Sequence, residues 1–175
     1  MTKLENKIRG ALYGVAVGDA LGAPLEFMSA AEIIGKYGSA VKEMLGGGWL
    51  NVKPGETTDD TQMTVAAALA IAMHPEEPEP YAGQNFVKWA LSDPKDIGGT
   101  CHSAISNALQ MMKQRPELKG CAGLAPYEVW EKASQLTAKQ NGNRSAGNGA
   151  LMRTYTQVFI TPTEPGQKLW LNASA

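Results

Sequence analysis

Two adjacent carboxylates stand between threonines in the stretch Thr57-Thr58-Asp59-Asp60-Thr61-Gln62, directly before an apolar run that continues to residue 73. Thr58 or Asp59 can cap a helix N-terminus, and Asp59 with Gln62 three positions later has the pattern of a capping box. The stretch therefore predicts a helix over about 60–73. A capped helix alone would explain it, but carboxylate and hydroxyl oxygens are also the hard ligands that Mg²⁺ or Mn²⁺ prefers. A metal site is the second interpretation.

A stripe of glycines runs through the segment 4–22, whose apolar residues have helical spacing. Gly10, Gly14, Gly18 and Gly22 are each four residues apart, and a glycine inside a helix costs about 1 kcal/mol relative to alanine. The stripe predicts a buried helix that a second backbone or a ligand approaches closely. Charged residues in the same segment argue against a membrane-spanning helix with GxxxG packing.

Acidic residues occur at and just after the end of this segment. Asp19 is surrounded by apolar residues, so its carboxylate needs partners. We expect it to be paired with backbone donors and cations, with a direct contact to a metal as the alternative. Pro24 should end the helix, and Glu26 begins an irregular loop that can bring its carboxylate to a site.

Apolar periodicity also predicts helices elsewhere in the chain, near 28–38, 86–91, 100–112 and 126–139. The proline-rich stretch 74–80 is expected to be a solvated connector. No helical pattern is convincing after residue 153, so we expect a helical domain over 1–153 and an irregular tail over 154–175.

Two glycine-containing loops are candidate ligand sites. Asp96-Ile97-Gly98-Gly99-Thr100 leads into a helix, where exposed N–H groups can bind phosphate or sugar hydroxyls, although such a glycine pair is common before helices. The glycines of residues 141–153 permit positive φ, and this loop is expected to run into a helix whose N-terminus would favour a pyrophosphate. A flexible turn without function is the alternative for the second loop.

Composition excludes several classes of protein. The chain has 175 residues, 43% of them hydrophobic, and a net charge of −1, which is typical of one globular domain and gives no basic footprint for nucleic acid. Its two cysteines and two histidines form no zinc-type motif, so a metal should be held by oxygen. Without a signal-peptide-like or membrane-length apolar run, we expect a soluble cytoplasmic protein.

Four segments taken together resemble the ADP-ribosylglycohydrolase family, in the family's order and over roughly residues 5–153. They are Gly14-Val15-Ala16-Val17-Gly18-Asp19-Ala20-Leu21-Gly22, Thr58-Asp59-Asp60-Thr61, Asp96-Ile97-Gly98 and Ser145-Ala146-Gly147-Asn148-Gly149-Ala150-Leu151-Met152-Arg153. The resemblance implies an all-α, orthogonally packed helical bundle with two Mg²⁺ or Mn²⁺ ions in a cleft. It also implies hydrolysis of the bond between ADP-ribose and a protein side chain such as arginine.

The resemblance assigns roles residue by residue. It implies that Thr58, Asp59 and Asp60 hold metal, with Asp59 and Asp60 catalytic together with Glu26, the acidic residue of a loop near the substrate. The substrate-binding residues that it implies are Asp96 on the ribose side, with the adjacent Gly98, and Gly147, Asn148 and Gly149 at the diphosphate.

The sequence departs from the family in one respect, since the late acidic segment that completes the metal pair has no counterpart after residue 153. We therefore expect a bundle incomplete on its C-terminal side, zero or one weakly held ion, and self-association or a protein partner over the uncovered apolar faces. The first hypothesis is a hydrolase acting on ADP-ribosylated protein through metal-activated water. The alternative is a weak or inactive short form that binds ADP-ribose or inhibits a protein partner.

Overall fold

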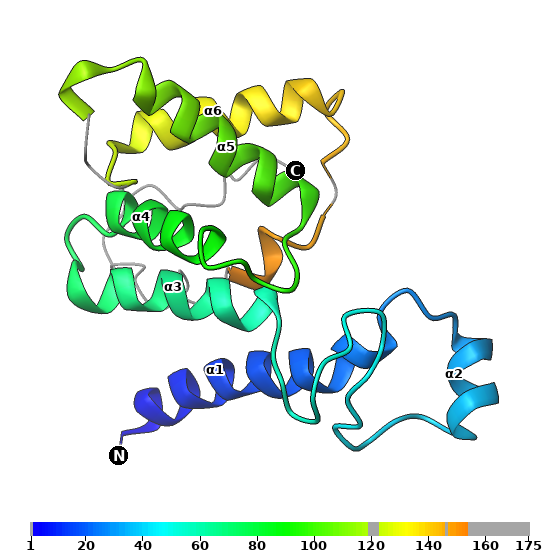
Figure 1. Cartoon of the computed structure of the whole chain (residues 1–175). Helices are drawn as coiled ribbons and strands as arrows, with labels where there is room; N and C mark the ends of the chain where they lie inside the picture. Colours follow the sequence, from blue (N-terminus) through cyan, green and yellow to red (C-terminus); the bar gives the residue numbers. More distant parts are fainter. Residues whose placement is uncertain (1, 119–122, 146, 154–175) are drawn as a thin grey trace.

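The chain is all-α wherever its structure is described, as the resemblance implied. A computed structural model describes residues 2–118, 123–145 and 147–153, and the predicted tail lies outside these ranges. They contain no β-strand and six α-helices, shown in Figure 1: α1 (Lys3–Gly22), α2 (Ala30–Tyr37), α3 (Asp59–Met73), α4 (Glu79–Ala90), α5 (Gly99–Lys113) and α6 (Tyr127–Gln140).

Helices α3 to α6 form the packed part of the molecule, with α3 against α4 and α5 against α6. Between α5 and α6 lies a core of small and aliphatic side chains: Ala108, Met112, Ala125, Val129 and Ala133. A second cluster, made of Met63, Cys101 and Met152, joins α3 to α5 and to the short 3₁₀ turn Leu151–Arg153. The apolar pattern of the sequence correctly predicts that α3, α5 and α6 are helical.

Helix α4 begins earlier than its apolar pattern predicts. Glu79 and Pro80, the last two residues of the connector expected over 74–80, belong to the first turn of α4. Proline is tolerated in the first turn because the N–H that it lacks would have no intrahelical partner there. The stacked rings of His74 and Tyr81, whose centroids lie 3.3 Å apart, hold the turn between α3 and α4.

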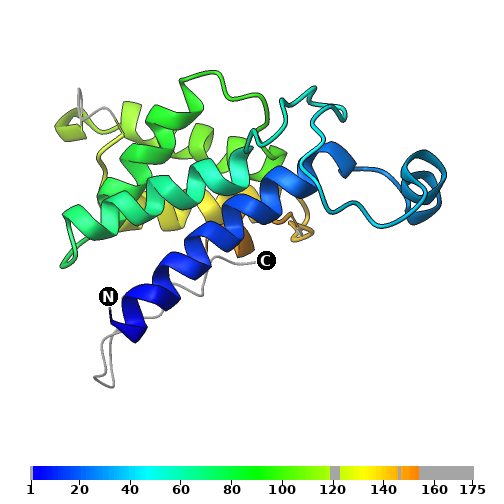
Figure 2. The same ribbon diagram turned by 90° about the horizontal axis from the view of Figure 1, so that it is seen from below.

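Helix α1 lies across α3, and the other described residues leave most of its surface uncovered (Figures 1 and 2). A capping box between Thr2 and Glu5 begins it, and Ala20 is its one buried residue in the described structure. A Cβ added at Gly10, Gly14 or Gly18 would meet no described atom within 4 Å. The predicted close packing on the glycine stripe is therefore wrong for the described chain, since local spacing identifies a face but not what covers it.

The start of α3 differs from the predicted capping box. Thr58 is the N-cap residue, but neither its side chain nor a box between Asp59 and Gln62 caps the helix. Asp19 of α1 does so instead, accepting hydrogen bonds from the amides of Thr58 and Thr61 at 2.8 and 3.1 Å and from their hydroxyls at 2.7 and 2.6 Å. The expected backbone partners of Asp19 are confirmed, and threonine hydroxyls take the place of the expected cations.

Residues 23–57 form an arm between α1 and α3. It consists of the 3₁₀ turn Ala23–Leu25, helix α2, which buries none of its residues, and a loop that returns to α3 (Figure 1). The return passes through three glycines at 46–48, all with positive φ. A Cβ at Gly48 would lie 2.7 Å from Cα of Pro24, so only glycine allows this approach of the loop to the end of α1.

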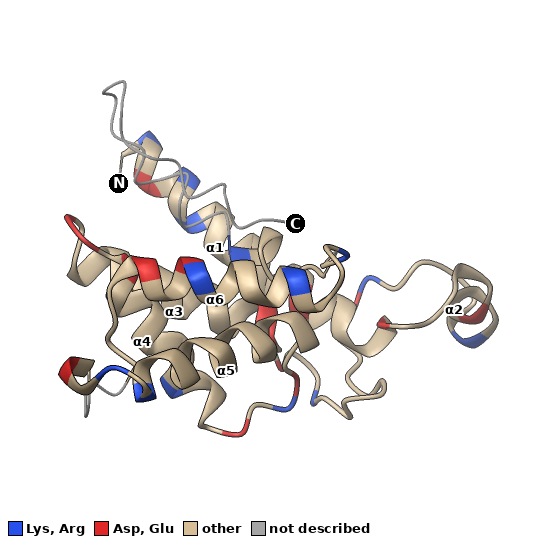
Figure 3. Ribbon diagram, turned by 90° about the horizontal axis from the view of Figure 1, so that it is seen from above, with Lys and Arg blue, Asp and Glu red and all other residues tan. Residues whose placement is uncertain are grey.

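Charged side chains form no extended basic face on the described helices. Figure 3 shows acidic and basic residues interspersed along them. Within the same ranges, none of the helices has both the length and the apolar character that crossing a bilayer requires.

Candidate active site

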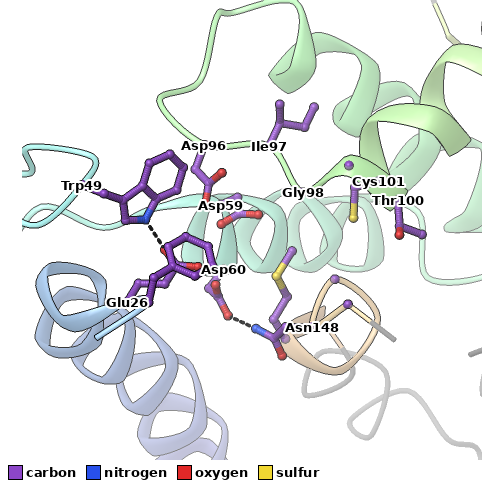
Figure 4. A pocket seen from close by; sticks show the side chains of 15 residues that line it. Glu26, Trp49, Asp59, Asp60, Asp96, Ile97, Gly98, Thr100, Cys101 and Asn148 are labelled. Atoms are coloured by element: carbon purple, nitrogen blue, oxygen red, sulfur yellow. Dashed lines mark hydrogen bonds between the residues drawn. The ribbon is translucent and has the colours of Figure 1, made fainter. Parts of the chain in front are cut away.

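A hollow of about 340 Å³ opens at the N-terminus of α3. Five segments form it: the turn after α1, the loop before α3, the first turn of α3, the junction of the 91–98 loop with α5, and residues 147–152 (Figure 4). All of the predicted site residues except Thr58 line it. The complete lining is Glu26, Phe27, Trp49, Asp59, Asp60, Asp96, Ile97, Gly98, Gly99, Thr100, Cys101, Gly147, Asn148, Gly149 and Met152.

Asp59 and Asp60 are the first two residues of α3 and form the floor of the hollow. Asp59 is only 8% exposed. Burial, followed by the negative charge of Asp19, raises the pKa of the Asp59 carboxyl, and a backbone hydrogen bond from Gly98 opposes this. Burial and the charges of Asp59 and Asp19 raise the pKa of Asp60 in the same way.

Asp96 completes the acidic lining from the loop before α5. Burial raises its pKa, and the charges of Asp59 and Glu26 add to this effect. Because the carboxylates repel one another and the described part of the lining contains no Lys or Arg, a bound cation would relieve the repulsion. The pocket is therefore suited to a cation.

Asn148 connects the late glycine-containing loop to this acidic floor. Its Nδ2 donates to Oδ1 of Asp60 at 2.6 Å, and the hydroxyl of Thr64 lies 2.7 Å from the carbonyl oxygen of Met152. Arg153 donates through Nε to the carbonyl of Gly149 and lies over the ring of Phe86. These contacts fix the loop against α3 and α4.

The predicted helix after this loop is wrong within the described residues, because Leu151–Arg153 is a single 3₁₀ turn. Packing explains why residue 149 is a glycine, since a Cβ at this position would collide with Sγ of Cys101. Burial raises the pKa of the Cys101 thiol, which disfavours the thiolate form.

Thr58 lies behind the hollow, where its hydroxyl donates to Asp19. The Thr58 oxygen still has free lone pairs. However, Thr58 does not line the hollow, so the structure does not place it for the direct metal contact that the resemblance implies. Among the described residues, no three His, Cys, Asp or Glu side chains converge as an ion-binding group. The donor set of Asp59 and Asp60 fits one hard divalent ion held from one side, with Oδ1 of Asp60 already bonded to Asn148.

Sequence reasoning missed two aromatic residues of the pocket, Phe27 and Trp49. The indole Nε1 of Trp49 donates to Oε2 of Glu26 at 2.8 Å, and its ring centroid lies 5.4 Å from that of Phe27. The available signal was the position of Phe27 beside Glu26 and of Trp49 directly after three glycines. A contact between residues 23 positions apart has no local pattern that would have predicted it.

The sequence of this chain is similar to known proteins over nearly its whole length. The family model of ADP-ribosylglycohydrolases matches residues 1–173. The chain is 34% identical over 173 residues to the ADP-ribosyl-[dinitrogen reductase] glycohydrolase of Rhodospirillum rubrum, a match that covers 98% of this chain and 51% of that protein. It is 29% identical over 144 residues to the ADP-ribosylarginine hydrolase Tri1 of Serratia proteamaculans, covering 74% of this chain and 38% of that protein.

The Tri1 protein of Pseudomonas putida is 31% identical over 108 residues, covering 60% of this chain and 28% of its own length. The chain thus spans about half the length of the Rhodospirillum relative and less of the other two. On the match over nearly its whole length, this chain belongs to the ADP-ribosylglycohydrolase family.

Proposed function

We propose that the pocket at the start of α3 is a hydrolase site that removes ADP-ribose from modified protein side chains. The observation that carries the proposal is the gathering of Glu26, Asp59, Asp60 and Asp96 from three separate segments in one hollow. Carboxylates placed together in this way cost stability, so their retention is better explained by a site than by the fold.

Each acidic residue has a proposed task. Asp59 and Asp60 hold one Mg²⁺ or Mn²⁺, which when bound supplies an activated water and a positive charge near the sugar. Asp96 accepts hydrogen bonds from ribose hydroxyls. Glu26 orients the attacking water. Asn148 fixes the Asp60 carboxylate, and the backbone of Gly98, Gly147 and Gly149 allows the diphosphate to come close.

Hydrolysis at this site adds the water oxygen to the anomeric carbon of the ribose and breaks the bond from that carbon to the side-chain nitrogen. The water protons go to the new hydroxyl and to the leaving nitrogen. An ADP-ribosyl-arginine-like substrate is proposed because the Serratia relative is an ADP-ribosylarginine hydrolase and because the acidic lining would attract a guanidinium.

Release of ADP-ribose from an ADP-ribosyl-arginine protein in Mg²⁺ tests this function directly. Asp60→Asn should reduce release at least tenfold by weakening the metal site, since it removes charge without changing shape. Asp93→Asn is the matched control, because Asp93 is exposed and lies outside the pocket. No release by the parent chain at high protein concentration, or equal rates for parent and Asp60→Asn, would contradict the proposal.

A second candidate function is binding of ADP-ribose with little or no turnover, by the pocket alone or against a protein partner. Among the described residues only the donor pair Asp59 and Asp60 is placed to hold an ion, and two carboxylates cannot fill the coordination shells of two octahedral ions, which supports this second function. We expect calorimetry to show zero or one weakly bound Mg²⁺ per chain. Binding of ADP-ribose without release would support this second function, whereas two tightly bound ions would favour the hydrolase.

We also propose self-association or a protein partner over the apolar face of α3. Val65, Leu69 and Met73 follow one another at intervals of four along this helix, and each is exposed. Sedimentation at tens of micromolar should show a species larger than the monomer, and Leu69→Glu should shift it towards the monomer. A strictly monomeric parent chain would contradict self-association.

A further inference from the structure

The Glu26 carboxylate is held by one side chain from a distant part of the arm. Glu26 follows the 3₁₀ turn at the end of α1, while Trp49 follows the three-glycine turn, and their hydrogen bond measures 2.8 Å (Figure 4). Glu26 is an exposed residue, so without this contact its side chain would sample several rotamers. The bond therefore selects one orientation at the pocket.

Electrostatics makes this selection necessary. Asp59, Asp60 and Asp96 all experience the negative charge of Glu26. Their repulsion favours rotamers that point the Glu26 carboxylate away from the hollow. A charge-assisted hydrogen bond from an indole N–H is stronger than a neutral one and opposes this tendency.

The backbone at Phe27, directly after Glu26, is held at a cost to stability. Phe27 has φ of 63° although it is neither glycine nor asparagine, and it is 81% exposed. Trp49 is 55% exposed. A strained, exposed aromatic residue is uncommon, and such strain persists where the surroundings require it.

Two contacts explain why Phe27 keeps this strained conformation. The rings of Phe27 and Trp49 meet at 59° with centroids 5.4 Å apart, within the favoured range for aromatic pairs. Gly48 brings the loop against Pro24, and this approach places Trp49 beside Glu26. Hydrogen bond, ring pair and close backbone approach all serve to place one carboxylate.

We propose that Trp49 is a positioning residue that turns the Glu26 carboxylate into the pocket, with Phe27 holding the Trp49 ring. The inference rests on the proposed hydrolase function, because it gives Glu26 its orientation in that reaction. Trp49 itself need not touch the reacting atoms.

Trp49→Phe tests the proposal because it keeps an aromatic ring for Phe27 and removes the N–H donor. We expect kcat to fall about 10- to 100-fold, the range typical of a misplaced catalytic group, with KM changed less than about twofold. Trp130→Phe is the matched control: its Nε1 has no hydrogen-bond partner in the described structure, and it lies on α6 outside the pocket. That variant should retain the parent kcat.

A double-mutant cycle separates positioning from a general loss of structure. If Trp49 acts through Glu26, adding Trp49→Phe to Glu26→Ala should lower kcat by less than about twofold further. Trp49→Leu, which has no side-chain donor, replaces Trp49→Phe if that variant does not fold. A parent-like kcat in the single variant, or a full additional loss in the Glu26→Ala background, would overturn the proposal. Absence of turnover in the parent would instead refute the proposed function, and the inference with it.

Discussion

Helices α3 to α6 bury their apolar faces against one another, whereas α1 and α2 together bury one residue within the described structure. The two parts meet through polar contacts: Asp19 hydrogen-bonds to Thr58 and Thr61, and Glu56 of the arm pairs with Lys95 at 2.7 Å. Within the part that contains α1 and α2, Gly48 lies against Pro24 and holds the arm to the end of α1. The candidate site lies at this junction, with Glu26 on one side and the aspartates on the other. Its geometry therefore depends on a few specific contacts more than on a shared core.

The largest expected effect comes from cutting the junction at Asp19. Asp19→Ala leaves the first amides of α3 without their acceptor and removes four hydrogen bonds to a charged group. We expect the free energy of unfolding to fall by about 3 kcal/mol, measured by urea denaturation. Asp19→Asn, which keeps one acceptor oxygen, should lose less. Parent-like stability of Asp19→Ala would mean that α1 and α3 are coupled by other contacts.

The next effect concerns the contact that holds the arm to the end of α1. Gly48→Ala places a Cβ against Pro24 at a φ of +70°, so we expect a loss of about 2 kcal/mol in urea denaturation. Gly38→Ala is the matched control, with φ of +74° but no described atom within 4 Å of the added Cβ. It should show only the backbone strain, about 1 kcal/mol. Equal losses in the two variants would refute the close approach.

The same contrast explains what the sequence could and could not predict. Helices α3, α5 and α6 have regular apolar spacing and clear starts, so local patterns identify them. The gathering of Asp59, Asp60, Asp96 and Asn148 followed from the resemblance, since these residues are up to 89 positions apart by their numbers. Their proposed roles stay predictions.

The errors arise where a tertiary partner decides the outcome. The carboxylate that caps α3 lies 39 residues before Thr58, so the local pattern of Asp59 and Gln62 led to the wrong capping group. The glycine stripe identified one face of α1 correctly, but spacing carries no information about the neighbour of that face. Instead, part of the stripe lines a second hollow together with Asp60 and Asn148.

A smaller effect, of opposite sign, is expected on the glycine stripe. Gly14→Ala adds a Cβ in open space within a helix, which restricts the unfolded chain more than the folded one. The free energy of unfolding should rise by roughly 0.5–1 kcal/mol. Urea denaturation of Gly14→Ala beside the parent measures it. A loss of stability would show that something outside the described residues, in the same chain or another copy, packs on the stripe.

The smallest effect concerns the acidic pocket itself. The pKa values of Asp59, Asp60 and Asp96 are raised on folding, so the folded state binds protons more strongly than the unfolded state there. Their contribution to stability is present below the ordinary aspartate pKa of 3.8 and is lost as the pH rises through the higher folded values. At neutral pH without a divalent ion, the cluster therefore destabilises the fold.

Asp60→Asn should relieve part of this repulsion while keeping an oxygen that accepts from Asn148. Because the site is open to solvent, we expect a gain of only about 0.5 kcal/mol, or roughly 1–2 °C in Tm, in EDTA at pH 7. The gain should vanish near pH 4, where the carboxylates are increasingly protonated in both states. Mg²⁺ should raise the Tm of the parent and of Asp93→Asn but not that of Asp60→Asn, because an ion that binds the folded state stabilises it. A Tm of Asp60→Asn below the parent in EDTA would show that the hydrogen bond from Asn148 to a charged carboxylate outweighs the repulsion, and the acidic pocket would then be stable without a cation.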